Sequence, residues 1–308
     1  MPMIEFRSPS PQDREWVLPL LAAEGLPLCD YSFPVLYCWQ DAFRIRIARL
    51  GGRLLVRLNS SLGSSYLWPA GQGSPIPALE ALAADAAALG QPLRLICLTL
   101  YHKNWLAAHC PRPMQFQEAR DNFDYLYAVD RLADLPGRKL HAKRNYLHRF
   151  DAACPGWSWS QLRDSDVSGC LALDAAWHRA ALEREPLQNN TTLNEERRAL
   201  ALAFAHRTEL GLDGVVLRWR GRILAFALGA PLTETVYDVH FERACGSIPG
   251  DYAAVNRAFA QYVRSQYPQI RYLNREDDMG VPGLRQAKLS YYPEYLQVNF
   301  CAVESGVD

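Results

Sequence analysis

The chain has 308 residues, of which 49% are hydrophobic and 21% are charged. This is an ordinary globular composition, and the length allows two domains of usual size or one large domain. The 33 basic and 33 acidic residues balance, which excludes a strong overall attraction to nucleic acid or to an anionic membrane but not a local basic patch.

The sequence contains no segment typical of a secreted, membrane-spanning or zinc-binding protein. Residues 1–15 are rich in charge and contain no long apolar run, unlike a signal peptide. No uninterrupted apolar segment reaches the roughly 20 residues of a membrane span. The eight cysteines form no C-x-x-C pair, and no H-E-x-x-H motif occurs. We therefore expect a cytoplasmic protein with reduced, buried thiols and without a zinc site.

The first third of the chain predicts a hairpin that turns on glycine. Two apolar runs, residues 43–50 and 54–58, flank Gly51-Gly52. Glycine pairs accept the positive φ that a tight hairpin requires. The other elements predicted here are strands at 66–68 and 93–98 and helices at 10–24, 78–89 and 101–109.

A basic helix is predicted at residues 132–150, after a strand at 121–129. No acidic residue lies between Asp134 and Asp151. Lys143 and Arg144 follow Leu140 by three and four residues, so they lie on or beside the apolar stripe of this helix. Together with Asn145 they are candidates for binding an anion. The alternative is that their stems cover apolar surface while their charges remain solvated.

The strand predicted at residues 235–242 carries three ionisable groups. Alternation along a strand places Asp238, His240 and Glu242 on one face, opposite the apolar residues of the same strand. This pattern indicates either a functional cluster or the solvated face of an antiparallel sheet. A single histidine does not predict a metal site. The other strands predicted beyond Pro155-Gly156 are 157–162, 215–219, 223–231, 272–274 and 296–303, and the helices are 165–183, 194–210 and 250–266.

Residues 272–295 combine apolar strand residues with charges of both signs. Asn274, Arg275, Glu276 and Asp277 follow directly on a predicted strand. A turn at Gly280, Pro282 and Gly283 leads into a short helix that carries Arg285 and Lys288 one helical turn apart. Polar residues where a core is expected are typical of functional sites.

The two halves of the chain share an order of elements, in which a glycine-turned hairpin precedes a further strand, a helix and more strands. Strands that alternate with helices and also form hairpins predict mixed α/β sheets. We expect two similar α/β domains, at residues 1–135 and 156–308, joined by a basic connecting helix at 136–155. The second domain carries the candidate site.

The residue pattern resembles a known family. Asn274-Arg275-Glu276-Asp277-Asp278-Met279-Gly280, followed by Gly283-Leu284-Arg285, Ala287-Lys288 and Ser290-Tyr291, is similar to the C-terminal domain of bacterial phosphatidylglycerol lysyltransferases. Lys143-Arg144-Asn145 and residues 238–242 extend the similarity. The resemblance implies tandem GNAT-like domains, related to the Fem-type peptidyltransferases, without a tightly bound cofactor. It also implies that charged transfer RNA donates an aminoacyl group.

The sequence therefore predicts acyl transfer to an amine or hydroxyl on a lipid, a peptide or a small molecule. Peripheral contact with a membrane is compatible with this prediction. Such a reaction needs a base and positively charged groups. The candidate catalytic residues are Asp238, His240, Glu242, Glu276 and Asp277. The candidate substrate-binding residues are Lys143, Arg144, Asn145, Asn274, Arg275, Arg285, Lys288 and Tyr291.

Two alternatives remain. Residues 243–248 fit four positions of the Q/R-x-x-G-x-G/A turn with which acetyltransferases bind coenzyme A, but Ile248 replaces the final small residue. Acyl-CoA is therefore the second candidate donor. The other alternative is a non-catalytic binding or regulatory protein that kept the fold.

Overall fold

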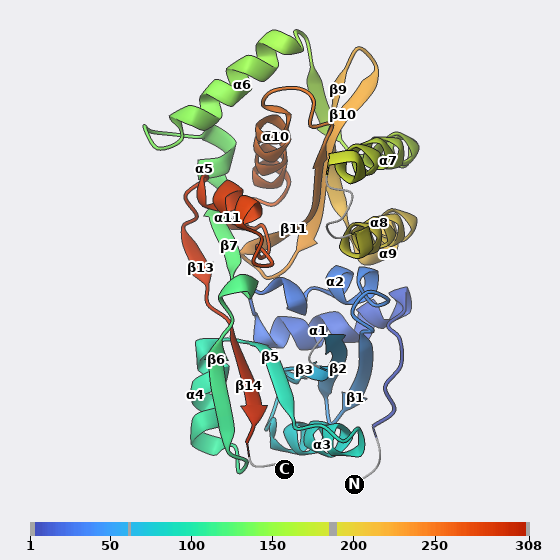
Figure 1. Cartoon of the computed structure of the whole chain (residues 1–308), viewed down its shortest axis with the longest axis vertical. Helices are drawn as coiled ribbons and strands as arrows, with labels where there is room; N and C mark the ends of the chain where they lie inside the picture. Colours follow the sequence, from blue (N-terminus) through green and yellow to red (C-terminus); the bar gives the residue numbers. More distant parts are fainter. Residues whose placement is uncertain (1–3, 61–62, 185–189, 306–308) are drawn as a thin grey trace. The chain divides into compact units, whose positions relative to one another are not determined.

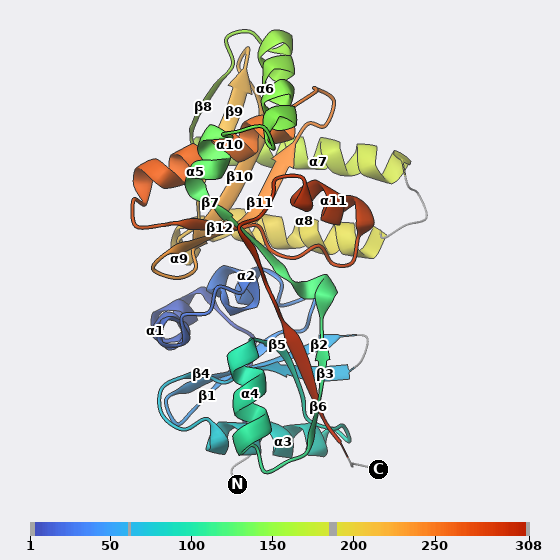
Figure 2. The same ribbon diagram turned by 90° about the vertical axis from the view of Figure 1, so that its left-hand side faces the viewer.

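The computed structural model describes residues 4–60, 63–184 and 190–305 (Figures 1 and 2). The chain forms two compact units. Unit 1 comprises residues 1–124, 277–282 and 296–308, and unit 2 comprises residues 125–276 and 283–295. Each unit is built on one mixed β-sheet with helices packed on it.

The sheet of unit 1 contains the predicted glycine-turned hairpin. Its first two strands are antiparallel and meet at Gly51-Gly52, where both glycines have a positive φ. The strands follow one another in the order β1 (Arg46–Leu50), β2 (Arg53–Ser60), β3 (Gly63–Leu67), β5 (Arg94–Leu98), β14 (Phe300–Glu304) and β6 (Met114–Glu118), and β4 (Ala70–Gly71) pairs with β2. Among the pairings of the described strands of this sheet, only that of β3 with β5 is parallel. Their parallel course requires a crossover, which contains α3 (Ile76–Ala88).

The other helices of unit 1 are α1 (Arg14–Glu24), α2 (Phe33–Cys38) and α4 (Leu100–His109), with short 3-10 turns at Pro11–Asp13, Cys29–Tyr31 and Arg120–Asn122. Asp85 of helix α3 forms hydrogen bonds with side chains of the sheet. Its carboxylate accepts hydrogen bonds from the Tyr66 hydroxyl (2.6 Å) and from Arg57 Nη1 (3.0 Å). These contacts mark the face of the sheet that α3 covers.

The sheet of unit 2 has strand order β13 (Tyr295–Gln297), β7 (Asp124–Ala128), β12 (Tyr272–Asn274), β11 (Val236–Ala244), β10 (Arg222–Pro231), β9 (Asp213–Trp219) and β8 (Ser158–Gln161). Strands β11 and β12 are parallel, and α10 (Asp251–Gln266) lies in the crossover between them. Helix α10 covers one face of the sheet, whereas α7 (Val167–Arg184) and α8 (Asn190–Ala205) lie on the other (Figure 1).

The remaining helices of unit 2 are α5 (Val129–Asp134), α6 (His141–Ala153), α9 (Arg207–Leu210) and α11 (Pro282–Leu289). The helix predicted at residues 132–150 is divided into α5 and α6, and α6 lies within the basic helix expected at residues 136–155. Leu135 adopts a left-handed conformation with φ 50°, and Pro136 follows it. A proline disfavours helical geometry at the residue before it.

The two sheets share one topology. From β1 to β6 in unit 1 and from β9 to β13 in unit 2, each has an antiparallel hairpin, a third strand, a parallel strand after a helical crossover, and two further strands. The repeat predicted from element order is therefore present in the sheets.

The units differ from the expected domains, because each sheet takes a strand from the other end of the chain. Strand β7 was expected in the first domain and pairs with β12, whereas β14 was expected in the second and pairs with β5 and β6. The boundary thus falls at Tyr125 instead of residue 135, and residues 296–308 return to unit 1.

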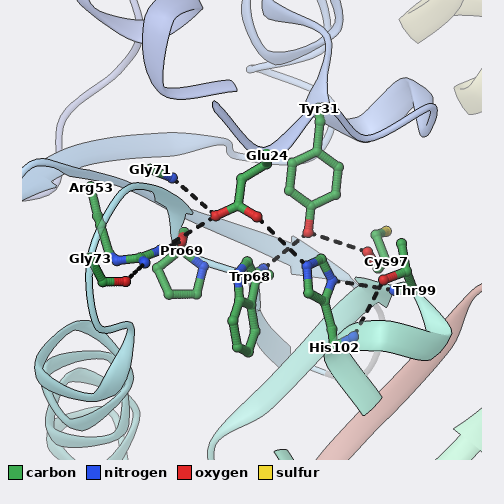
Figure 3. A network of polar contacts seen from close by, with 10 residues as sticks. All are labelled: Glu24, Tyr31, Arg53, Trp68, Pro69, Gly71, Gly73, Cys97, Thr99 and His102. Carbon is green, nitrogen blue, oxygen red and sulfur yellow. Dashed lines mark hydrogen bonds and ion pairs between the residues drawn. The ribbon is translucent and has the colours of Figure 1, made fainter. Parts of the chain in front are cut away.

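In unit 1 a tyrosine joins the two parallel strands just beyond their last paired residues. The pairing of β3 with β5 ends at Leu67 and Ile96. The buried Tyr31 hydroxyl then accepts a hydrogen bond from Trp68 N (3.1 Å) and donates one to Cys97 O (3.2 Å) (Figure 3). The hydroxyl thus satisfies two backbone groups that the diverging strands leave without a strand partner.

A partly exposed carboxylate, that of Glu24, lies beside this bridge. Glu24 Oε1 accepts hydrogen bonds from Gly71 N (3.2 Å) and Arg53 Nη1 (3.4 Å), and Glu24 Oε2 lies 3.9 Å from His102 Nε2 (Figure 3). The ring of His102 stacks on Trp68 at 4.5 Å. These contacts connect α1, α4 and the sheet, so we assign this network to the stability of unit 1.

Candidate active site

The candidate site of unit 2 lies where β11 and β12 stop pairing. The two strands pair only from Val236 with Tyr272 to Asp238 with Asn274. The last pair is fully buried, and the charged residues follow directly after it. In open α/β sheets, ligands bind at the carboxyl ends of parallel strands, where neighbouring strands lead away from each other.

A β-bulge at His240 divides the predicted row of ionisable groups. Leu228 pairs with Phe241 and Gly229 with Val239, so His240 is the extra residue of β11. Side chains before and after the bulge therefore do not follow a single alternation.

Contacts on either side of the bulge show the reversal. Tyr237 packs on Phe259 of α10 with 5.7 Å between ring centroids, whereas Arg243 Nε donates to Asp174 Oδ1 of α7 (2.9 Å). Asp238 and His240 therefore lie on the α7 side of the sheet, and Glu242 lies on the α10 side. The prediction that all three share one face is wrong, because strict alternation fails at a bulge.

The first group of side chains, which we call the carboxylate–histidine group, comprises Asp238, His240 and Glu276. His240 Nδ1 lies 3.2 Å from Glu276 Oε1 and 3.5 Å from Asp238 Oδ2. Asp238 and His240 are buried, and the Glu276 side chain is 26% exposed. An imidazole held between carboxylates through one nitrogen can exchange a proton through the other, which is the arrangement of a histidine general base.

The position of Glu276 depends on an unusual backbone conformation. Its φ is 55°, and its N–H donates to Asn274 Oδ1 (2.7 Å). A positive φ is uncommon for residues other than glycine and clusters at functional sites. Asn274, predicted to bind substrate, therefore orients Glu276 through this turn.

The carboxylate–histidine group also has the composition of a metal site. One ligand atom from each of its three residues lies within 4.8 Å of the others. Two carboxylates and an imidazole suit a divalent cation such as Zn²⁺ or Mn²⁺. The sequence predicted no metal site because it offered a single histidine, and the third ligand, Glu276, is joined to the other two only by the pairing of β11 with β12.

The second group, which we call the cation–aromatic group, lies on the other side of the sheet and comprises Lys143, Glu242, Arg275 and Tyr291. Arg275 Nη2 donates to Glu242 Oε1 (2.9 Å), and its guanidinium lies 5.1 Å from the centroid of the Tyr291 ring. Lys143 Nζ lies 3.8 Å from the same centroid. Cations over an aromatic face are attracted by its quadrupole.

The charge of Lys143 is held in an unfavourable environment. Burial, together with the nearby positive charge of Arg275, lowers the pKa of Lys143 from 10.5 to about 8, and Glu242 opposes this shift. Lys143 Nζ donates a hydrogen bond to Ser290 Oγ (2.7 Å). Two cations facing a single carboxylate leave the group with a net positive charge at neutral pH, which suits an anionic ligand.

Two members of this environment escaped prediction. Asn256 Nδ2 of α10 donates to Glu242 Oε2 (3.2 Å). The Tyr127 hydroxyl of β7 donates to the carbonyl of Lys288 (2.8 Å), and the Tyr127 ring lies 5.8 Å from the Arg275 guanidinium. Tyr127 was missed because β7 was assigned to the other domain, and the asparagine has no sequence signal of its own.

Other candidate residues of unit 2 have structural contacts or lie apart. Lys288 is buried, and its ammonium donates to the carbonyl of Arg275. Arg144 donates to the carbonyls of Leu135 and Gly137 (2.7 Å for Gly137), so it fixes the turn before α6. Asn145 is exposed, with Nδ2 3.4 Å from His141 Nδ1, and Arg285 is half-buried on α11.

Asp277 belongs to unit 1, unlike the other candidate residues. Its Oδ1 accepts a hydrogen bond from Met279 N (3.1 Å), which is the geometry of an Asx turn. The neighbouring Asp278 is buried and pairs with Arg120 at 3.2 Å, while Arg275 pairs with Glu242. The run of acids in the sequence is thus divided between different structural roles.

The sequence matches one protein family over nearly its whole length. Residues 26–303 match the family described as phosphatidylglycerol lysyltransferase, C-terminal. The chain belongs to this family. No functionally curated protein matches it.

Three solved structures share the fold of this chain. A conserved protein of unknown function from Bacteroides thetaiotaomicron is 31% identical with a TM-score of 0.90, and the match covers 98% of this chain and 100% of that one. L-PGS from Bacillus licheniformis is 15% identical with a TM-score of 0.67, covering 97% and 93%. FemX is 11% identical with a TM-score of 0.56, covering 97% of each chain. The predicted fold class of tandem GNAT-like α/β domains is confirmed.

A helix that spans a membrane must be both long and apolar. Across residues 4–60, 63–184 and 190–305, no helix combines the necessary length and apolarity.

Proposed function

We propose that this protein transfers an aminoacyl group from the ester of an aminoacyl-tRNA to an amine or hydroxyl acceptor. The observation that carries the proposal is the contact of His240 Nδ1 with Glu276 Oε1 at the point where β11 and β12 diverge. Membership in the lysyltransferase family and the fold shared with FemX support the same chemistry.

The carboxylate–histidine group supplies the base in this proposal. With Nδ1–H directed at Glu276, Nε2 of His240 accepts the proton of the attacking amine or hydroxyl. A bond forms between the acceptor and the ester carbonyl carbon. The bond from that carbon to the ribose oxygen then breaks, and the leaving oxygen takes the proton from His240. Asp238 helps to stabilise the transient imidazolium.

The cation–aromatic group serves binding in this proposal. Its net positive charge suits a phosphate near the end of the donor RNA, because Lys143 and Arg275 contact the same ring while Glu242 pairs with Arg275 alone.

Acyl-CoA is the alternative donor, and the turn after β11 disfavours it. The side chain of Arg243 pairs with Asp174 and Glu196 (2.9 Å each). The N–H of Gly246 donates to Asp251 Oδ2 (2.6 Å). Backbone amides of such a turn bind pyrophosphate only when they are available to it. An amide already bonded to a carboxylate therefore favours transfer RNA as donor.

A binding and transfer assay tests the proposal. Purified protein is titrated with aminoacyl-tRNA, uncharged tRNA and acetyl-CoA at two salt concentrations, and ester loss is followed with lipid, peptide and small-amine acceptors. We expect salt-sensitive RNA binding and acceptor-dependent ester loss. Saturable binding of acetyl-CoA without RNA binding contradicts the choice of donor. If the protein binds neither RNA nor acetyl-CoA, the result favours the hypothesis of a non-catalytic protein.

A chelator distinguishes the base from a metal-assisted mechanism. If His240 acts as a base, dialysis against EDTA leaves the transfer rate unchanged. A rate that falls with EDTA and returns with a divalent cation assigns the carboxylate–histidine group to a metal instead.

A further inference from the structure

Unit 1 contains a hollow that the proposed reaction does not use. Its volume is about 530 Å³, within the range of small-molecule sites. Strands β3, β5 and β14 and the residue before β14 line this hollow with Ser65, Arg94, Ile96, Asn299, Cys301 and Val303.

Strand register places these side chains on one face of the sheet. Tyr66 pairs with Leu95, so Ser65 lies beside Arg94. Val303 also pairs with Arg94. Alternation then puts Ile96 on the face of Arg94, opposite the Tyr66 face that α3 covers. The hollow therefore lies on the sheet face away from α3.

Two buried polar atoms of the hollow lack hydrogen bonds. Ser65 and Asn299 are each only 1% exposed, yet Ser65 Oγ and Asn299 Oδ1 have no hydrogen-bond partner within the described chain. The amide of Asn299 is oriented, since its Nδ2 donates to the carbonyl of Asn122 (2.8 Å). Its Oδ1 is thus fixed as an acceptor. Buried polar groups are rarely left unsatisfied, so the pair indicates a missing ligand or bound water.

Arg94 gives the hollow a positive charge. Its side chain is half-buried, and its guanidinium forms neither an ion pair nor a hydrogen bond with the residues that the structure describes. Burial raises the pKa of the Cys301 thiol, the charge of Arg94 opposes that rise and the charge of Asp30 adds to it, so Arg94 and Asp30 both lie within electrostatic range of Cys301. An arginine with no internal partner favours a carboxylate or phosphate.

The polar groups occupy the two ends of the hollow. Arg94 lies at the start of β5 with Ser65 of β3 beside it, whereas Asn299 precedes Phe300, which pairs with Leu98 at the end of β5. Four strand residues separate these ends by about 13 Å. Between the two ends, Ile96 and Val303 provide apolar surface. The ends therefore differ in what they bind, an anion at one and a hydrogen-bond donor at the other.

We propose that this hollow binds an elongated organic acid with a terminal hydroxyl. Arg94 and Ser65 hold its carboxylate, the chain of methylenes lies along Ile96 and Val303, and the hydroxyl donates to Asn299 Oδ1. The site belongs to unit 1 and is independent of the acyl-transfer proposal for unit 2.

Three matched probes test the proposal by calorimetry on the full chain: 8-hydroxyoctanoate, octanoate, which lacks the hydroxyl, and octane-1,8-diol, which lacks the charge. We expect saturable binding of 8-hydroxyoctanoate, at least about tenfold tighter than that of either analogue. Absence of saturable binding by all three, or equal affinities, overturns the proposal and assigns Ser65 and Asn299 to bound water.

Substitutions locate the binding. Arg94→Gln is expected to weaken 8-hydroxyoctanoate at least about tenfold, whereas the control Arg179→Gln, an exposed arginine of α7, leaves affinity unchanged. Unaltered affinity in Arg94→Gln overturns the proposal. Thermal unfolding of each variant verifies that it is folded.

Cysteine alkylation gives a second readout that does not depend on affinity. Cys301 lines the hollow and Cys245 lies in unit 2, and both are partly exposed. Bound 8-hydroxyoctanoate should slow the reaction of Cys301 with iodoacetamide several-fold and leave Cys245 unaffected. Equal protection of both thiols, or of neither, counts against a ligand in the hollow.

Discussion

His240 Nδ1 and Glu276 Oε1 lie 3.2 Å apart, although 36 positions separate the two residues in the sequence. Two features of the fold bring them together. The parallel pairing of β11 with β12 places Asn274 beside Asp238, and the bulge at His240 directs the imidazole to the same side of the sheet.

The first prediction concerns this contact. His240→Gln should lower the rate of aminoacyl transfer by about 10²–10⁴-fold, because the general base is lost. Glu276→Gln should cause a smaller loss and displace the pH–rate profile, because it removes the negative charge that stabilises the imidazolium. Transfer assays across pH provide the measurement. Equal rates for His240→Gln and the unsubstituted protein would falsify the assignment.

The second prediction concerns Lys143, whose pKa of about 8 lies below its usual 10.5. Between these values the unfolded chain holds a proton that the folded chain has released, so this residue makes the free energy of unfolding rise with pH in that window. Below pH 8 both states are charged, and the folded state bears the full cost of burying the ammonium.

Lys143→Met should therefore stabilise the protein at pH 7 by about 1–2 kcal/mol, after allowance for solvent screening of this partly exposed ammonium and for the lost hydrogen bond to Ser290, while weakening binding of an anionic donor. Urea unfolding at pH 7 and pH 9.5 measures the first effect. The difference between variant and parent should shrink at the higher pH. A difference that grows with pH contradicts the burial of this charge.

The third prediction concerns the ion pair of Arg275 and Glu242, whose side chains are 15% and 12% exposed. Removing one partner leaves the other charge largely buried, at a cost of about 3–5 kcal/mol. We expect Glu242→Gln and Arg275→Gln each to destabilise strongly and the double variant to cost less than the sum. A double-mutant cycle by chemical denaturation tests this coupling. Additive effects would show that the pair is not coupled.

The fourth prediction concerns the hydroxyl of Tyr31, which bridges β3 and β5. Tyr31→Phe leaves Trp68 N and Cys97 O without this partner and should destabilise unit 1 by about 1–3 kcal/mol. The matched control is Tyr101→Phe, since Tyr101 is 68% exposed and should tolerate the change. Thermal unfolding compares the two. A loss of transfer activity without a loss of stability would mean that Tyr31 has a role beyond this bridge.

The fifth prediction concerns Gly229, opposite the bulge of β11. A Cβ atom built at Gly229 comes within 2.1 Å of the carbonyl of Asp238. Gly229→Ala should therefore destabilise by about 3 kcal/mol or more through overpacking and disturb His240. Gly283→Ala is the control, because its Cβ meets no atom within 4 Å. Similar stability of both variants would contradict the close approach of β10 to β11.

Local patterns in the sequence predicted most elements of this fold. The glycine pair at residues 51–52 fixed the first hairpin, because two positive φ angles are easily adopted only there. The repeated order of elements predicted two similar sheets, and the run from Asn274 to Tyr291 predicted the family. These features depend on neighbouring residues, so the sequence contains them directly.

Tertiary structure alone decided which distant residues meet. The exchange of β7 and β14 depends on strand pairing between residues far apart in the chain, which no local pattern records. The bulge at His240 separated Glu242 from Asp238, and the pairing of β11 with β12 brought Glu276 to the histidine. The sequence shows which chemically active side chains the protein has. Strand register and bulges decide which of these side chains meet, because one inserted residue in a strand reverses the faces of all residues that follow it.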